Sequence, residues 1–194
     1  MIAFVKGKFV QKTPAHLIVD VQGVGYELHI SLNTYEAIQG KEEGLLYTYL
    51  QIKEDAHVLF GFSEPAEKEL FIHLISVSGV GAATARMMLS SVKPDELIKI
   101  IVHGNTAQLE KIKGIGKKTA ERIVLELKDK LAKMGPTTNI SPLINNTLDQ
   151  DALNALVALG IGRSAAEQAV KRVLTAEPGN SQVEDIIKKA LKLI

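Results

Sequence analysis

The sequence contains no cysteine among its 194 residues. Disulfides, zinc sites built from thiolates and cysteine-ligated iron–sulfur clusters are therefore excluded, as expected for a reducing compartment. No apolar run approaches the roughly 18 residues of a membrane-spanning helix, and the first residues alternate apolar with polar side chains, unlike a signal peptide. We therefore expect a cytoplasmic protein that has no membrane partner.

Motifs for nucleotide chemistry and metal binding are also missing. The segment GKKT at 116–119 resembles the end of a P-loop, but Lys111 stands where that loop needs a glycine. The glycine pair at 79–81 lacks the third glycine of a dinucleotide-binding turn. The histidines are scattered without metal-ligand spacing, at His16, His29, His57, His73 and His103. We therefore predict a protein that is not an enzyme and that uses no cofactor and no metal.

The net charge of +1 does not by itself indicate a nucleic-acid-binding protein, but the charges are unevenly distributed. Residues 1–62 hold five Lys and Arg against seven Asp and Glu, a net charge of −2. Residues 63–134 hold twelve against nine, a net charge of +3, and residues 135–194 hold six of each. The middle of the chain is therefore the part best suited to an anionic partner.

The stretch Leu109–Leu127 has the pattern of two helices joined by a glycine turn, and the second helix opens with Lys-Lys-Thr. The free amides at the start of a helix, together with the helix dipole, form a seat for a phosphate. This pattern is a helix-hairpin-helix, which grips the nucleic-acid backbone without reading bases. The predicted DNA-binding residues of this hairpin are Gly114, Gly116, Lys117, Lys118, Thr119 and Arg122.

The same pattern occurs 35 residues earlier, in residues 74–89. Sliding the sequence by that amount superposes Gly79 on Gly114 and Gly81 on Gly116, with their apolar neighbours in step. Two copies with the same flanking spacing indicate a duplicated module, which would grip two phosphates across a duplex minor groove. The predicted DNA-binding residues of the first hairpin are Gly79, Gly81, Ala82, Ala83 and Arg86.

Residues 1–62 have the pattern of a small β-barrel, with β-branched and aromatic segments separated by turn residues. The predicted strands are Ile2–Val10, His16–Val21, Gly25–Ile30, Leu45–Ile52 and Ala56–Phe62. A helical stretch at 33–39, between the third and fourth strands, indicates an OB-fold. We therefore predict an α+β chain with a five-stranded OB-fold barrel at 1–63 and a tandem helix-hairpin-helix domain at 64–134.

A polar segment rich in proline and asparagine, at 135–148, predicts a flexible linker. Beyond it, residues 149–194 carry three helical patterns and predict a three-helix bundle. A further glycine pair, Gly160 and Gly162, is not followed by lysine and threonine, so we interpret it as a plain turn between helices. A small neutral bundle on a tether suits the binding of a protein partner.

The turn Lys53-Glu54-Asp55, between the fourth and fifth predicted strands, has two interpretations. In the first, the charged side chains simply keep a hairpin turn in contact with water. In the second, the two carboxylates repel phosphates and keep DNA strands apart. The residues themselves do not choose between these.

Two other functions stay open for the hairpins. Base-excision glycosylases have a similar hairpin with a lysine nucleophile at the place of Lys118, and they need a carboxylate well beyond it. Here Asp129 lies only eleven residues further, on the same predicted helix, so that constellation is incomplete. The second alternative is a structural protein that bridges DNA without any further partner.

Taken in order along the whole chain, these motifs resemble the RuvA family, the Holliday junction-binding subunits of the bacterial branch-migration complex. The matching segments are MIAFVKG at the start, GVGYE at 23–27, KEDA at 53–56, LFGF at 59–62, both hairpins and ALVALG at 155–160. One departure is Ala82-Ala83, since relatives commonly carry a basic residue just after the first glycine pair.

The resemblance implies a homotetramer, or a pair of tetramers, that holds a four-way junction open and nearly planar during recombination and DNA repair. It also implies that Glu54 and Asp55 form an acidic pin at the crossover. It further implies that residues 149–194 bind and regulate the ATPase RuvB, and that the resolvase RuvC is another partner. The residues that would contact RuvB are Leu156, Leu159, Gly160 and Ile161.

Overall fold

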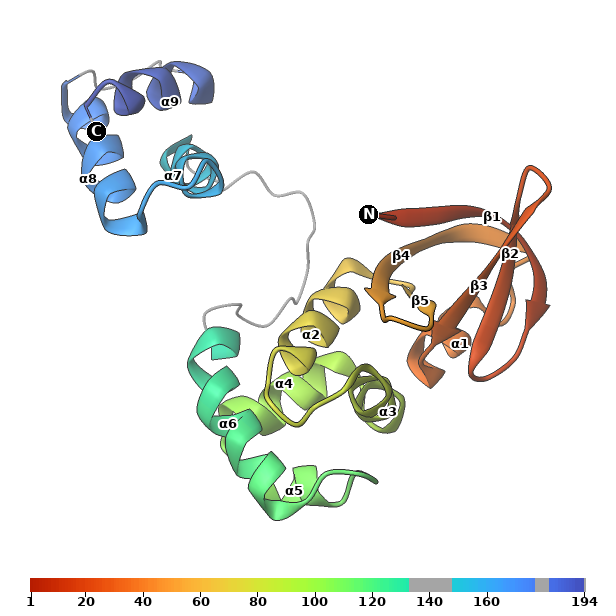
Figure 1. Ribbon diagram of the computed structural model, residues 1–194. Coiled ribbons are helices and arrows are strands. Elements are labelled where there is room, and N and C mark those ends of the chain that lie inside the picture. Colours follow the sequence, from red (N-terminus) through yellow and green to blue (C-terminus); the bar gives the residue numbers. More distant parts are fainter. Residues whose placement is uncertain (133–147, 177–181, 194) are drawn as a thin grey trace. The chain divides into compact units, whose positions relative to one another are not determined.

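The computed structural model describes residues 1–132, 148–176 and 182–193 (Figure 1). The chain divides into two compact units, Met1–Thr138 and Asn139–Ile194. The flexible linker predicted at 135–148 lies outside the described residues, apart from its last residue, which begins a helix. Among the described helices, none is both long enough and apolar enough to cross a membrane.

The first unit begins with the predicted barrel. Its strands are β1 (Phe4–Lys12), β2 (His16–Val21), β3 (Val24–Ile30), β4 (Glu43–Ile52) and β5 (His57–Phe62). They close in the order β1-β2-β3-β5-β4, and all neighbours are antiparallel except β3 and β5. Helix α1 (Leu32–Ile38) connects β3 to β4. This order and the place of the helix confirm the OB-fold prediction.

Alternation along β2 and β3 decides which side chains fill the barrel. Leu17, Val19 and Leu28 are fully buried, while His16 and Glu27, next to them in sequence, lie on the outer face. This is the period of two that a strand with one buried face requires. The outer face of β2 and β3 therefore carries polar, chemically active side chains.

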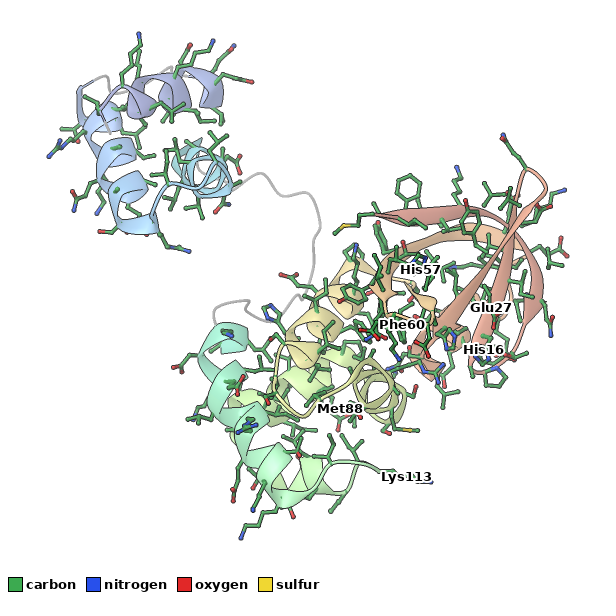
Figure 2. All side chains as sticks on the ribbon, in the orientation of Figure 1. His16, Glu27, His57, Phe60, Met88 and Lys113 are labelled. Carbon is green, nitrogen blue, oxygen red and sulfur yellow. The ribbon has the colours of Figure 1, made fainter. Side chains whose placement is uncertain are left out.

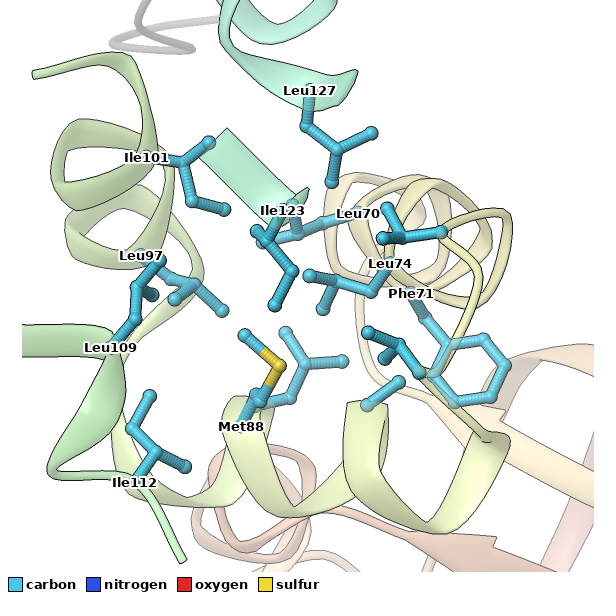
Figure 3. Close-up of a cluster of buried hydrophobic side chains, with 14 of the residues drawn as sticks. Leu70, Phe71, Leu74, Met88, Leu97, Ile101, Leu109, Ile112, Ile123 and Leu127 are labelled. Carbon is cyan, nitrogen blue, oxygen red and sulfur yellow. The ribbon is translucent and has the colours of Figure 1, made fainter. Parts of the chain in front are cut away.

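Five helices follow the barrel in the described residues 64–132. They are α2 (Pro65–Ile75), α3 (Ala82–Ser91), α4 (Pro94–Val102), α5 (Thr106–Glu110) and α6 (Lys117–Ala132). Pro65 and Pro94 occupy the first position of α2 and α4, where a missing amide hydrogen costs nothing. Figure 3 shows the apolar side chains of these helices converging around Met88, Leu74 and Ile123, all fully buried.

The barrel and the helices share part of this core. Phe71 of α2 packs between Phe60 and Phe62 of β5, with ring centroids 5.0 Å apart in each pair. Aromatic rings at this distance and tilt stabilise a fold by more than the burial of their apolar surface alone. The domains predicted at 1–63 and 64–134 are therefore packed together within one compact unit, so the position of that boundary stays a prediction.

A buried carboxylate also joins the barrel half to the helical half. Glu67 of α2 is only 3% exposed and accepts hydrogen bonds from the hydroxyls of Ser31 and Thr34, at the start of α1. Burial raises the pKa of Glu67, although both hydroxyl contacts lower it. Ser31 also accepts from the amide of Thr34 at 3.0 Å, as an N-cap.

The second unit contains the predicted three helices, α7 (Leu148–Ala158), α8 (Arg163–Ala176) and α9 (Val183–Leu191). Their buried faces consist largely of small and β-branched residues, including Ala152, Ala169 and Val170. Small residues let three short helices approach closely enough to enclose a core from few side chains.

Candidate nucleic-acid interface

The first hairpin lies between α2 and α3. Gly79 has a φ of 92°, which favours glycine because a Cβ is strained in this left-handed region. The amide of Val80 donates to the carbonyl of Val77 at 3.0 Å and closes the turn. The amide of Ala85 donates to Gly81 at 2.9 Å as the first bond of α3.

The second hairpin, between α5 and α6, has the same geometry. Gly114 has a φ of 93°, Ile115 donates to Ile112 at 3.1 Å, and Ala120 donates to Gly116 at 2.9 Å. Every one of these contacts corresponds to one in the first hairpin at a separation of 35 residues. The duplicated module predicted from the glycine spacing is therefore a duplicated structure.

The first backbone amides of α3 and α6 have no hydrogen-bond acceptor within the described part of the first unit. Within residues 1–132, the backbone amides of 82–84 and of 117–119 donate no hydrogen bond. Gly79, Gly81, Gly114 and Gly116 are all exposed, so both bends lie at the surface. Unpaired amides at the positive end of a helix dipole are suited to an anion.

Lysine side chains lie beside the second of these helix starts. Lys117 and Lys118 are exposed and Thr119 is half-buried, while Lys113 extends from the preceding turn (Figure 2). At the first hairpin, Ala82 is buried in the core and Ala83 is exposed. The first hairpin therefore offers backbone amides, and the second offers amides together with lysine side chains.

The predicted contact residue Arg86 faces the barrel. Its Nη1 donates to the carbonyl of Ala15 at 3.0 Å and lies 3.4 Å from Nδ1 of His29. Burial lowers the pKa of His29, and the nearby His16 and Arg86 lower it further, against the opposite effect of Glu27. Arg86 thus connects α3 to the barrel, a contact that nothing local in the sequence signalled.

Arg122 connects the two hairpins. Its Nη1 donates to the carbonyl of Ser78, in the turn of the first hairpin, at 3.3 Å. Its Nε lies 3.9 Å from Oε1 of Glu126, and the Arg122 side chain is 52% exposed. The guanidinium therefore reaches from α6 to the turn of the first hairpin, while the Arg122 side chain remains partly open to solvent. Ser78 was not among the residues predicted from sequence.

The acidic turn forms the connection from β4 to β5. Glu54 and Asp55 are both exposed, and the amide of Lys53 donates to the carbonyl of Ala56 at 2.9 Å. The bond closes a tight turn that presents the two carboxylates at its tip.

The turn between α7 and α8 shares the glycine conformation and the first helix bond of the hairpins, but Ile161 donates to Leu156, five residues back, and α8 begins with Arg163, which pairs with Glu167. Gly160 has a φ of 91°, and Ala166 donates to Gly162 at 3.0 Å. Of the residues predicted to contact a partner, Leu159 is 65% exposed, Gly160 is exposed and Ile161 is half-buried. Leu156 is fully buried, so its side chain supports the bundle instead of forming its surface.

Three family models match successive parts of the chain. The RuvA N terminal domain matches residues 1–61, the SAM-like helix-hairpin-helix tandem matches residues 71–129, and the RuvA C-terminal domain matches residues 148–194. A protein of Christiangramia forsetii called Holliday junction branch migration complex subunit RuvA is 45% identical over 192 residues, which is 99% of each chain. The chain belongs to the RuvA family.

Other RuvA relatives match over the same extent. A protein of Bacteroides fragilis with the same name is 44% identical over 200 residues, covering 99% of both chains. One of Cytophaga hutchinsonii is 42% identical over 199 residues, covering all of both. The resemblance to RuvA inferred from the motifs is therefore confirmed along the full length.

Proposed function

We propose that this chain binds four-way Holliday junction DNA and takes part in branch migration, as the names of its relatives state for them. The observation that carries the proposal is the pair of matching hairpins, whose amides at 82–84 and 117–119 are unpaired. Val80, Ile115 and the other apolar residues of both hairpins belong to one buried core, which holds the two phosphate seats at a fixed separation, and Arg122 adds a hydrogen bond to Ser78. Such seats grip the backbone of any sequence.

The two seats contribute differently to affinity. At the second hairpin, Lys117 and Lys118 add charge to the amides, and each phosphate contact by a lysine releases condensed counterions. At the first hairpin, Ala83 adds no charge, the Arg86 guanidinium is already engaged by Ala15, and the Arg122 guanidinium reaches the turn from α6 but donates to Ser78. We therefore assign most of the charge-dependent affinity to the second hairpin.

The remaining parts follow from the same proposal. The chain is a non-catalytic DNA-binding subunit, and the partner RuvB supplies ATP hydrolysis. A homotetramer, or two tetramers face to face, multiplies the paired seats around a symmetry axis, so that weak grips sum to recognition of a branched substrate. RuvC resolvase is a further proposed partner, and a cytoplasmic location remains a prediction.

We propose that Glu54 and Asp55 act as a pin at the junction centre. Both carboxylates stand at the tip of a closed turn, where like charge repels phosphates.

For the second unit we propose that Leu159, Gly160 and Ile161 contact RuvB. Leu159 is a large apolar side chain left exposed beside the α7–α8 turn.

The test is a glycine substitution that the fold tolerates. A Cβ at Gly116 would meet no atom within 4 Å, and its φ lies outside the left-handed region. Gly116→Ala should therefore leave the stability within about 1 kcal/mol, because only the small preference for glycine at a helix start is lost. Because Gly116 directly precedes the unpaired amides of 117–119, we expect the added methyl group to crowd a phosphate bound there.

The matched control is Gly162→Ala, at the corresponding position of the α7–α8 turn, where a Cβ also meets nothing within 4 Å. In gel shifts with four-way junction DNA, we expect Gly116→Ala to weaken binding about tenfold, or roughly 1.4 kcal/mol, and Gly162→Ala to change nothing. Equal binding by both variants would refute the phosphate seat. A wild-type chain with no preference for the junction over linear duplex would instead favour a DNA-bridging protein.

A further inference from the structure

Three side chains able to bind a transition metal meet on the outer face of the barrel. His16 of β2 pairs directly with His29 of β3, and Glu27 lies two residues before His29 on the same strand. Residues opposite each other, and residues two apart along a strand, project from the same face. Their ligand atoms all lie within 4.8 Å of one another. We call these three residues the His–Glu–His cluster.

The cluster lies at the surface, with Glu27 exposed and both histidines half-buried. It lies opposite the buried side chains of Leu17 and Leu28, which point into the barrel, and Figure 2 labels His16 and Glu27 together on the barrel. A surface depression of about 180 Å³ adjoins it, lined by Gln11, Thr13, His16, Ile18 and Glu27. An ion there has a path of entry and space for a water ligand.

The backbone that carries the cluster is held in place. The hydroxyl of Thr13 accepts from the amide of His16 at 2.9 Å and donates to its carbonyl at 3.0 Å. The strand pairing then continues without a break to Val21 and Val24. A site on a rigid pair of strands needs only side-chain rotation to close around an ion.

The rotation required is small. Ligands at about 2.0–2.2 Å from a tetrahedral Zn²⁺ lie roughly 3.4 Å from one another. The present atoms, within 4.8 Å, therefore need to approach by about 1 Å or less per side chain. The rings of His16 and His29 already lie edge to face, with centroids 4.5 Å apart.

We propose that the His–Glu–His cluster binds one divalent transition-metal ion, and that Zn²⁺ is the ion it fits. Two imidazoles and one carboxylate with an open fourth position form a ligand set that Zn²⁺ takes in proteins, whereas Mg²⁺ and Ca²⁺ take oxygen ligands. The carboxylate of Glu27 offsets part of the repulsion between the ion and the nearby guanidinium of Arg86. The ion links β2 to β3 beside the contact that Arg86 makes with Ala15.

The test is calorimetric titration of Zn²⁺ into the untagged full chain after treatment with a chelator. We expect one Zn²⁺ per chain with a Kd in the micromolar range, and no binding of Mg²⁺ at the same concentration. His16→Gln should weaken binding at least tenfold. The matched control His57→Gln alters an exposed histidine of the same barrel, outside the cluster, and should leave the affinity unchanged.

A second variant, Glu27→Gln, keeps the size of an exposed side chain and removes one ligand charge, so it tests the site even where His16→Gln fails to fold. Far-UV circular dichroism identifies such a failure. With Co²⁺ as a probe, the wild-type chain should develop the visible absorption of a low-coordinate site, which Glu27→Gln should reduce. No stoichiometric binding, or equal affinity in the wild type and Glu27→Gln, would overturn the proposal. Neither readout involves DNA, so failure here is distinct from failure of junction binding.

Discussion

Replacing Glu67 by alanine should destabilise the first unit, because this carboxylate holds two buried hydroxyl groups. Thr34 donates to it at 2.6 Å and Ser31 donates to the other carboxylate oxygen. Ser31 is 1% exposed and Thr34 is not exposed at all, so water does not replace the lost acceptor. A buried polar group without its partner costs about 1–3 kcal/mol.

The expected net loss for Glu67→Ala is about 2–4 kcal/mol. Leaving two buried hydroxyl groups without an acceptor accounts for the upper end of this range. Removing the carboxylate also removes the cost of burying it, and this gain lowers the net loss. Glu67→Gln should lie within about 1 kcal/mol of the wild type, because its amide still pairs with both hydroxyls after one of them rotates. Glu69→Ala, an exposed position on the same helix, should change the stability by less than about 0.5 kcal/mol.

The dependence on pH gives a second readout for Glu67. Because burial raises its pKa above the ordinary value of 4.5, the folded chain holds this proton more tightly than the unfolded chain. The resulting stabilisation is complete below the unfolded pKa and is lost as the pH rises through the folded pKa. Relative to Glu67→Gln, the wild type should therefore lose stability from about pH 4.5 upward.

Urea unfolding followed by tyrosine fluorescence measures these free energies. The chain has no tryptophan, and its tyrosines all lie in the first unit, at Tyr26, Tyr35, Tyr47 and Tyr49. The signal therefore reports the unit that contains Glu67. A loss below about 1 kcal/mol in Glu67→Ala would show that the hydroxyl network contributes little. If the difference in the free energy of unfolding between the wild type and Glu67→Gln stayed constant across this pH range, the raised pKa of Glu67 would be contradicted.

Three further predictions concern function. Lys118→Ala should weaken junction binding alike for all sequences and reduce the slope of log affinity against log salt by about 0.9, and a sequence-dependent loss would contradict backbone gripping. Glu54→Gln with Asp55→Asn should bind the junction at least as tightly as the wild type while altering branch migration with RuvB, so weaker binding in gel shifts would exclude repulsion by the pin. Deleting 149–194 should spare junction binding and abolish stimulation of RuvB ATPase, and parallel loss of both would refute separate roles for the two units.

The hairpins were predictable from sequence because their determinants are local. The strained φ of Gly79 and Gly114 and the turn bonds around them involve residues a few positions apart, which a repeated motif records directly. The same holds for the barrel, where the alternation of buried Leu17 and Val19 with half-buried neighbours marks a strand. Strand ends differed from the prediction by two residues or fewer, since end residues depend on pairing as well as pattern.

The individual site residues were harder to predict. Arg86 and Leu156 were expected at functional surfaces, but Arg86 donates to Ala15 of the barrel and Leu156 is buried in the small bundle. Each outcome depends on packing between elements far apart in the sequence. An arginine one turn into a helix looks the same in sequence whether it faces solvent or a neighbouring strand.

The sequence by itself determined the order of elements, the two matching hairpin turns and the absence of thiolate chemistry, because these depend on composition and on neighbours along the chain. The tertiary structure decided what distant residues do together. It joined Arg122 to Ser78 across two hairpins, and it set His16 opposite His29 where the sequence shows only scattered histidines. Strand register and helix packing are set by the whole hydrophobic core, so no local pattern encodes these pairings.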